Sequence, residues 1–189
     1  MAVSHNRRGV LQAVLGTSLG WLLPDAALAQ AADPRDARPQ VGDRLVYADG
    51  DQKGTTIKLD ALRVGGPPVT AMPQDAASGT VRDGSRLNQI LLVRLDPSRI
   101  TGDTQPRAAQ GVVAYSAVCT HAGCDGFAWT PEKQMYKCPC HDSEFDPADG
   151  AKITGGPATR RLAALPLKIV DGVMVAAGPF SGRVGVITT

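Results

Sequence analysis

Two short boxes decide how this chain folds: Cys119-Thr120-His121-Ala122-Gly123-Cys124 and, after a gap, Cys138-Pro139-Cys140-His141-Asp142-Ser143-Glu144-Phe145. All four cysteines of the chain lie in these boxes, together with two of its three histidines. Each box therefore offers both a thiol and an imidazole, which are the side chains that bind soft and borderline metal ions. The sequence predicts a metal site that draws on both boxes, and the rest of the chain is expected to support it.

Outside the boxes, the composition and the patterning favour an all-β fold. Aromatic residues make up only 4% of the chain, while 21 Gly and 14 Pro are typical of a turn-rich β protein. Short β-prone runs separated by turn formers predict small antiparallel sheets. The expected strands cover residues 44–47, 55–59, 89–95, 111–118, 134–137, 165–170, 173–176 and 183–187. Asp171-Gly172 is the strongest hairpin signal, and residues 65–68, 72–84 and 96–110 are expected to be loops.

The charge pattern and the motifs exclude several classes of function. Lys and Arg number 20 against 18 Asp and Glu, so the chain lacks the dense basic footprint of a nucleic-acid binder. Its carboxylates show no paired arrangement for acid–base chemistry, and no nucleophile motif is present. We therefore expect no catalytic residue and no nucleic-acid partner.

The N-terminal segment has the organisation of an export signal. Arg7 and Arg8 precede an apolar run, and an Ala-x-Ala sequence ends at Ala29. The paired arginines resemble a twin-arginine signal, so residues 1–29 are expected to be removed on export to the periplasm, and residues 30–43 to form a flexible tether. The alternative is an uncut anchor in the inner membrane, although the run of about 14 apolar residues is short for a spanning helix.

The spacing of the soft ligands allows two kinds of metal site. A Cys2His2 zinc site would use four of the six candidates and leave two cysteines unexplained. A [2Fe–2S] centre would bind one iron through two cysteines and the other through two histidines. A plant-type ferredoxin site is excluded because it needs four cysteines at different intervals.

The two boxes resemble the Cys-Thr-His-x-Gly-Cys and Cys-Pro-Cys-His-x-Ser signatures of the Rieske iron–sulfur proteins, in the branch of the cytochrome bc complexes and of the arsenite oxidase small subunit. The resemblance covers about residues 112–160 securely. It implies a Rieske fold over residues 44–189, made of small antiparallel sheets with an inserted cluster-binding subdomain at about residues 112–160. It also implies one [2Fe–2S] cluster per chain.

The same resemblance implies a role for each soft ligand. Carried over position by position, it makes Cys119 and Cys138 ligands of one iron, His121 and His141 ligands of the other, and Cys124 and Cys140 a disulfide between the boxes. Two neutral imidazoles in place of two thiolates raise the reduction potential to roughly −150 to +300 mV. A disulfide is expected only in an oxidising compartment, which agrees with the export signal.

Residues next to the expected ligands would cover the cluster or tune its potential. Ser143 stands where the family places a hydroxyl that donates to a bridging sulfide. Gly156 and Pro157, in the sequence Gly155-Gly156-Pro157, resemble the third loop that covers the cluster; without that resemblance they would be only a tight turn. The arginine pair at residues 160–161 is expected to be solvated, with partner docking as the alternative.

Three residues depart from the pattern of the high-potential members. Phe145 replaces a Tyr whose hydroxyl binds a ligand sulfur, and Asp142 replaces the usual Gly and brings a carboxylate near the cluster. Ala122 replaces the Leu that is frequent in quinol-oxidising complexes. Together they imply a lower potential and a different partner contact.

The resemblance implies one-electron transfer in the periplasm by a subunit of an oxidoreductase complex, which is not a catalyst alone. The leading hypothesis is the iron–sulfur subunit of a periplasmic oxidoreductase similar to arsenite oxidase, with a molybdenum partner, or a soluble relay to a c-type cytochrome. The alternative is the Rieske subunit of ubiquinol–cytochrome c reductase, beside a cytochrome b. A zinc-stabilised binding module without a redox role is the third hypothesis.

Replacing Phe145 with Tyr is expected to raise the reduction potential, because the added hydroxyl can donate a hydrogen bond to a ligand sulfur. Redox titration of the wild type and of Phe145→Tyr measures the difference. A potential that does not rise in the variant would refute this role for position 145.

Overall fold

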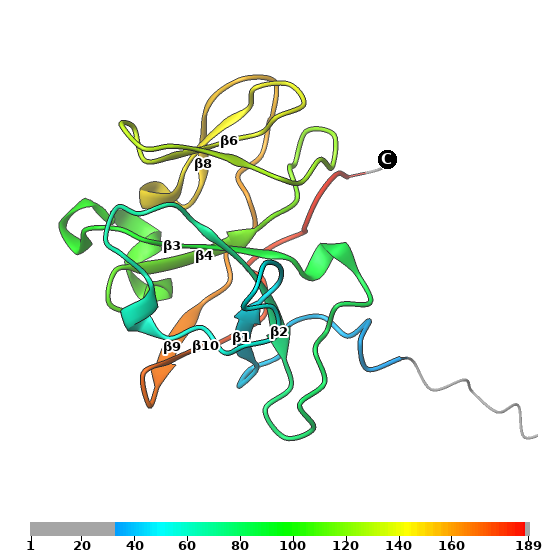
Figure 1. Ribbon diagram of the computed structural model, residues 1–189. Coiled ribbons are helices and arrows are strands. Elements are labelled where there is room, and N and C mark those ends of the chain that lie inside the picture. The colour runs from blue at the N-terminus through cyan, green and yellow to red at the C-terminus, as the bar shows by residue number, and fades with distance from the viewer. Residues whose placement is uncertain (1–32, 188–189) are drawn as a thin grey trace, which may run out of the picture. The chain divides into compact units, whose positions relative to one another are not determined.

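The computed structural model describes residues 33–187 (Figure 1). The export signal expected over residues 1–29 lies outside this range. Within it, no helix is long and apolar enough to cross a membrane. The strands are β1 (Arg44–Tyr47), β2 (Val69–Gln74), β3 (Ile90–Arg94), β4 (Val112–Ser116), β5 (Ala128–Thr130), β6 (Met135–Lys137), β7 (Glu144–Asp146), β8 (Lys152–Gly155), β9 (Leu167–Val170) and β10 (Val173–Ala176). The short 3-10 helices are η1 (Leu59–Ala61), η2 (Arg86–Asn88), η3 (Pro97–Arg99), η4 (Gly102–Arg107) and η5 (Pro147–Asp149).

The strands form two antiparallel sheets, which confirms the expected all-β fold. The larger sheet has six strands in the order β4-β3-β2-β1-β10-β9, and the smaller has four in the order β5-β6-β7-β8. The smaller sheet lies in sequence between β4 and β9, so the chain leaves the larger sheet, builds the smaller one and returns (Figure 1). Both boxes lie in this excursion: the first lies before β5, and the second begins directly after β6 and ends within β7.

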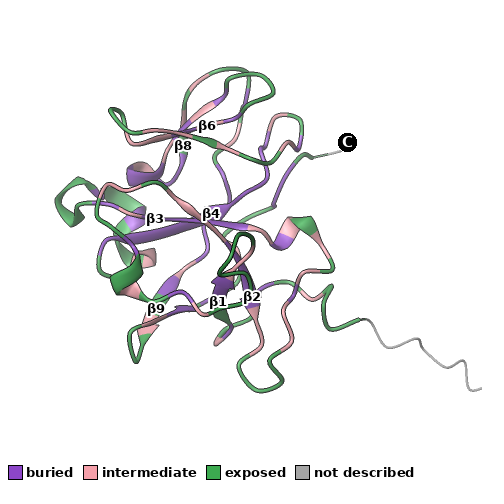
Figure 2. Ribbon diagram, in the orientation of Figure 1, coloured by how far each residue is buried: buried purple, intermediate pink, exposed green. Residues whose placement is uncertain are grey.

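Strands β3 and β4 are buried on both faces because each face covers a different core (Figure 2). Side chains alternate between the two faces of a strand. Leu91 and Tyr115 belong to a buried cluster that includes residues of the smaller sheet. Leu92 and Ala114 belong to a second buried cluster, whose strand residues all come from the larger sheet. This double burial explains the nearly continuous apolar runs in the sequence of these strands.

The strand predictions succeed where the run is long or the turn is specific. The strands β1 and β10 begin and end at the expected residues, and β3, β4, β6 and β9 lie within the expected runs. The hairpin at Asp171-Gly172 is confirmed: Val170 pairs with Val173, and the turn residues have φ of 51° and 78°. Two positive φ values are what a two-residue type I′ turn requires.

The expected loop at residues 72–84 is wrong in its first part, which completes β2. Pro73 has no N–H to donate, which argues against a central strand. However, β2 pairs with β3 only up to Ala71, whereas Pro73 lies opposite Leu45 on β1. The missing donor therefore breaks no bond to β3, and the Pro73 carbonyl accepts the N–H of Arg82 at 2.8 Å.

Two expected strands are not formed, and besides β2 three further observed strands were not predicted. Residues 55–59 contribute only isolated bridges to β1 and β10, and residues 183–187 form no strand. The strands β5, β7 and β8 have only three or four residues each, which is too short to show a period of two.

The described part of the expected tether is bound to the domain. Asp43 and Arg82, both buried, form a two-pronged ion pair at 2.7 and 3.0 Å. The buried side chain of Asn88 donates to the carbonyls of Ala37 and Arg82 and accepts from Arg38 at 3.1 Å. Residues 37–43 are thereby fixed beside η2, and the flexible tether expected over residues 30–43 does not extend to them.

Candidate metal centre

The two boxes fold into two loops with the same backbone construction. In each loop the N–H of the first cysteine binds the carbonyl five positions later, and its carbonyl accepts the N–H four positions later. The bonds are Cys119 N to Cys124 O (2.7 Å), Gly123 N to Cys119 O (3.0 Å), Cys138 N to Ser143 O (2.9 Å) and Asp142 N to Cys138 O (3.1 Å). The residue four positions after the first cysteine has a positive φ in both loops, 76° at Gly123 and 56° at Asp142. The loops therefore present their first cysteines in equivalent ways.

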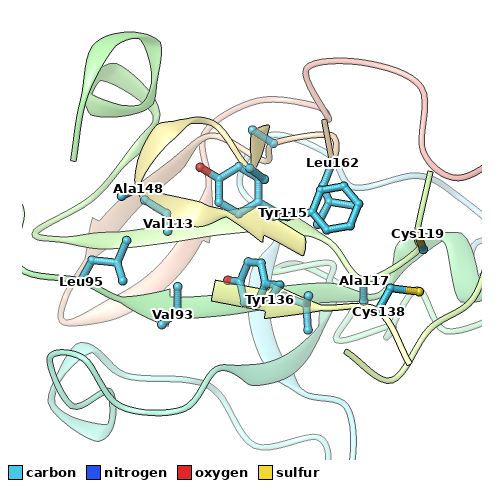
Figure 3. Packing of buried hydrophobic residues seen from close by; sticks show 14 of the residues in the cluster. Val93, Leu95, Val113, Tyr115, Ala117, Cys119, Tyr136, Cys138, Ala148 and Leu162 are labelled. Atoms are coloured by element: carbon cyan, nitrogen blue, oxygen red, sulfur yellow. The ribbon is translucent and has the colours of Figure 1, made fainter. Parts of the chain in front are cut away.

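The two cysteines that open the loops are unbridged and buried, with 0% of Cys119 and 2% of Cys138 exposed. They lie at one end of the buried cluster that the smaller sheet shares with β3 and β4 (Figure 3). Burial raises the pKa of the Cys119 thiol, while the N–H groups of His121 and Ala122 point at its sulfur and oppose the shift. The Cys138 thiol is within hydrogen-bond reach of Cys119. A metal could replace the thiol protons here and gain ready-made N–H donors.

The two histidines lie together, farther from the core. His121 is half-buried and His141 exposed, with ring centroids 4.7 Å apart and ring planes at 88°. The donor set is thus divided by depth into an inner pair of thiols and an outer pair of imidazoles. A [2Fe–2S] centre with two cysteines on one iron and two histidines on the other has this same division, so the residues fit the group that the resemblance implies.

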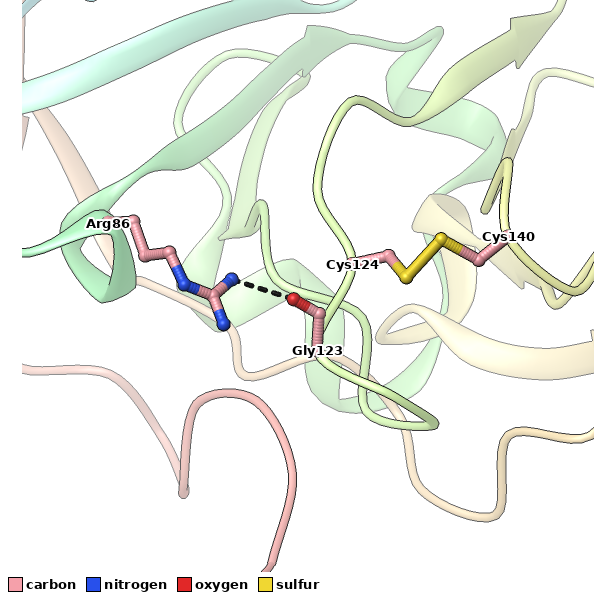
Figure 4. Close-up of a disulfide and its surroundings, with 4 residues drawn as sticks. All are labelled: Arg86, Gly123, Cys124 and Cys140. Carbon is pink, nitrogen blue, oxygen red and sulfur yellow. Dashed lines mark hydrogen bonds between the residues drawn. A yellow bond between two sulfur atoms is a disulfide. The ribbon is translucent and has the colours of Figure 1, made fainter.

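Cys124 and Cys140 form a disulfide that joins the two loops, with Cα atoms 6.6 Å apart (Figure 4). The Cys138 sulfur lies within 4.8 Å of both disulfide sulfurs. These three sulfurs do not form a separate metal site, because disulfide sulfurs are not the thiolates that bind metals. The disulfide instead closes the space beside Cys138 and ties one loop to the other.

The third loop packs against the second at its backbone. The Oγ of Ser143, fully buried, accepts the N–H of Ala158 at 3.1 Å, so its hydroxyl proton remains available for a further acceptor. Gly156 has φ of 79°, and a Cβ at this position would lie 2.5 Å from the Cα of Ser143. Glycine is therefore required at position 156 both by conformation and by space, and Pro157 follows it at the surface.

Phe145 lies in an aromatic cluster of the smaller sheet. Its side chain is fully buried on β7, and its ring meets Phe127 edge to face at 5.7 Å. Tyr136 lies opposite it on β6, with its hydroxyl buried and the pKa of that hydroxyl raised by burial. The Tyr136 side chain packs between Tyr115 and Trp129. Position 145 thus lies in the same apolar cluster as the two thiols.

Two arginines support the first loop, and no local sequence pattern indicates either role. Arg86, on η2, donates to the carbonyl of Gly123 at 2.7 Å (Figure 4). Arg160 was expected to be solvated, which is wrong: its guanidinium donates to the carbonyls of Arg183 and Gly185. Each contact joins an arginine to a backbone carbonyl that is more than 20 residues away in the sequence. A contact of this kind produces no local sequence pattern from which it could be predicted.

Thr120 connects this support to the first box. Its hydroxyl donates to the carbonyl of Arg160. The first loop is therefore held from η2 on one side and from residue 160 on the other. The neighbouring Arg161 is exposed, as expected.

Comparison with known proteins points to one family. The model of the Rieske [2Fe-2S] domain matches residues 72–166. A Haloferax mediterranei protein, named as a candidate Rieske subunit of a respiratory nitrate reductase, is 35% identical over 86% of this chain and 70% of its own length. The Rieske iron–sulfur subunit of the cytochrome bc1 complex of Streptomyces lividans is 38% identical over 51% of this chain and 58% of its own length.

Other bc1 relatives are much longer than the matched region, which spans 24% of the Mycobacterium tuberculosis subunit at 36% identity. Among solved structures, the ferredoxin of carbazole 1,9a-dioxygenase from Nocardioides aromaticivorans has a TM-score of 0.43 at 20% identity. That alignment covers 65% of this chain and 94% of the ferredoxin.

Replacing Gly156 with Ala is expected to push the third loop away from the second and to weaken cluster retention. The positive φ alone costs about 1–2 kcal/mol for a non-glycine residue, and the clash with Ser143 adds to it. Gly155→Ala is the matched control, because its Cβ would meet nothing closer than 3.7 Å and its φ is not positive. Iron content and the visible spectrum of both variants give the readout; equal retention would contradict the packing role.

Replacing Asp142 with Asn or Gly is expected to raise the reduction potential by a similar amount, on the order of tens of millivolts, because both remove a nearby negative charge. The effect is limited because Lys137 Nζ lies 3.0 Å from the exposed Asp142 carboxylate. Only Gly also relieves the left-handed backbone, so thermal unfolding should show a gain of up to about 1 kcal/mol for Asp142→Gly relative to Asp142→Asn. An unchanged potential in both variants would show that the carboxylate does not act on the cluster.

Proposed function

The chain belongs to the Rieske [2Fe-2S] family, whose cofactor is one [2Fe–2S] cluster, and we propose that it transfers single electrons as the iron–sulfur subunit of an exported respiratory oxidoreductase. The observation that carries the proposal is the division of the donor set by depth. Two buried thiols lie at the core, and two imidazoles lie together toward the surface.

The chain's own residues would bind, shield and expose the redox group. When bound, the cluster supplies a one-electron couple. Cys119 and Cys138 would hold one iron inside the apolar cluster, where water is excluded. His121 and His141 would hold the other iron, and the exposed face of His141 would be the nearest surface for a donor or acceptor. The disulfide between the loops would limit their movement as the electron enters and leaves.

We propose that the catalytic partner is a molybdenum oxidoreductase, as in arsenite oxidase, and that a c-type cytochrome is the second redox partner. The Haloferax mediterranei relative, which matches along most of this chain, supports a respiratory complex other than bc1. Ala122 and Phe145, where quinol-oxidising members carry Leu and Tyr, favour the same choice. The export signal expected in residues 1–29 and the disulfide support a periplasmic location.

A second candidate is the Rieske subunit of ubiquinol–cytochrome c reductase, working beside a cytochrome b. The match to bc1 subunits of Streptomyces and Mycobacterium supports it. That match covers only about half of this chain, 51% for Streptomyces lividans and 52% for Mycobacterium tuberculosis.

Purification of the tagged full-length chain from its own host separates the two candidates. The proposal predicts recovery from the periplasmic side together with molybdenum and c-type haem. Co-purification of b-type haem without molybdenum would support the second candidate. Recovery from the cytoplasm, without molybdenum and without haem, would contradict both candidate functions.

A further inference from the structure

A cavity of about 320 Å³ opens beside the first cluster loop. Ala122 and Gly123 form one wall, and residues 183–186 form the wall opposite. Val118 lies at its apolar base, where it packs with Val184 in a small buried cluster. Ala122 contributes only a methyl group to this lining.

Three arginines line the cavity, and no carboxylate of residues 33–187 is among the residues that line it. Arg38, Arg86 and Arg183 are among the lining residues, and none of the other lining residues is acidic. Within the part of the chain that the structure describes, Arg86 and Arg38 donate only to neutral oxygens, those of the Gly123 carbonyl and the Asn88 amide. Within residues 33–187 none of the three forms a salt bridge. Among the described residues, the positive charge that lines the cavity is therefore uncompensated.

The walls of this cavity are fixed by specific contacts. Arg160 holds the carbonyls of Arg183 and Gly185. A Cβ on Gly185 would lie 3.2 Å from Val118, and one on Gly123 would lie 3.3 Å from Val186. The two walls thus approach each other closely at Gly123, and the wall that contains Gly185 packs against Val118 at the base.

The mixture of charge and apolar surface fits a protein partner. Val186, which lines the cavity, is 38% exposed, and Ile187, which follows it in the chain, is 50% exposed. Protein interfaces commonly combine an apolar centre with a charged rim and are enriched in arginine. The wall residue Ala122 directly follows His121 in the chain, so a partner placed here would lie next to an expected iron ligand.

We propose that this arginine-lined cavity is the docking site for an acidic redox protein, which inserts a carboxylate-bearing surface segment between Arg38, Arg86 and Arg183. The inference rests on the proposed function and names the surface chemistry of the partner. In the docked complex, one electron passes from the reduced protein to one ferric haem, so one chain is oxidised for each haem iron that is reduced.

Stopped-flow mixing of the reduced holoprotein with ferric c-type cytochromes tests the proposal. An acidic and a basic cytochrome of similar potential serve as the probes. The rate constant with the acidic cytochrome should fall as ionic strength rises, and at low salt Arg183→Glu should lower it about tenfold. The same variant should raise the rate with the basic cytochrome. Arg38→Glu repeats the test from another part of the cavity.

Lys168→Glu is the matched control, because it makes the same charge change at an exposed position on β9 outside this cavity. It should leave both rates nearly unchanged. A change in reduction potential would move the two rates in the same direction, whereas docking moves them in opposite directions, so the pair of probes separates these effects.

Equal effects of Arg183→Glu and Lys168→Glu would overturn the docking site, and so would rates that do not depend on salt. Inhibition by sulfate at constant ionic strength, equal for both cytochromes, would identify a small-anion site instead and would also overturn it. If the purified protein held no reducible cluster, it could not be reduced before mixing. That result would refute the proposed function itself.

Discussion

The bond between Cys124 and Cys140 is the constraint on which the rest of the site depends. Backbone hydrogen bonds close each cluster loop on itself, from Cys119 to Cys124 and from Cys138 to Ser143. The disulfide joins the two closed loops, so that two thiols and two imidazoles from separate parts of the chain meet. Such a crosslink also stabilises the fold by restricting the unfolded chain.

The two loops share a backbone but differ in their electrostatic surroundings. On the first loop, the guanidinium of Arg86 binds the Gly123 carbonyl, and further arginines line the adjacent cavity. On the second loop, the left-handed position is occupied by Asp142, whose charge is paired with Lys137. The site is therefore electropositive on one side and nearly neutral on the other. This asymmetry favours approach of an acidic partner along the first loop.

The sequence predicted the parts of the fold that have local causes. The hairpin at Asp171-Gly172 follows from its turn chemistry, and the buried runs of β3 and β4 follow from their apolar character. The continuation of β2 through Pro73 could not be predicted, because it depends on which neighbouring strand pairs with that residue. The supports from Arg86 and Arg160 were also missed, since both consist of long-range bonds to backbone carbonyls. For the site, the boxes indicated the candidate ligands, but the division by depth needed the structure.

The central claim is that two cysteines and two histidines of this chain hold one [2Fe–2S] cluster. Iron and sulfide analysis of the purified full-length protein, combined with electron paramagnetic resonance before and after reduction, tests it most directly. The account predicts two irons and two sulfides per chain, no signal when oxidised, and a signal from one unpaired electron per chain after one-electron reduction. A colourless protein that contains one zinc per chain and gives no signal after reduction would contradict it.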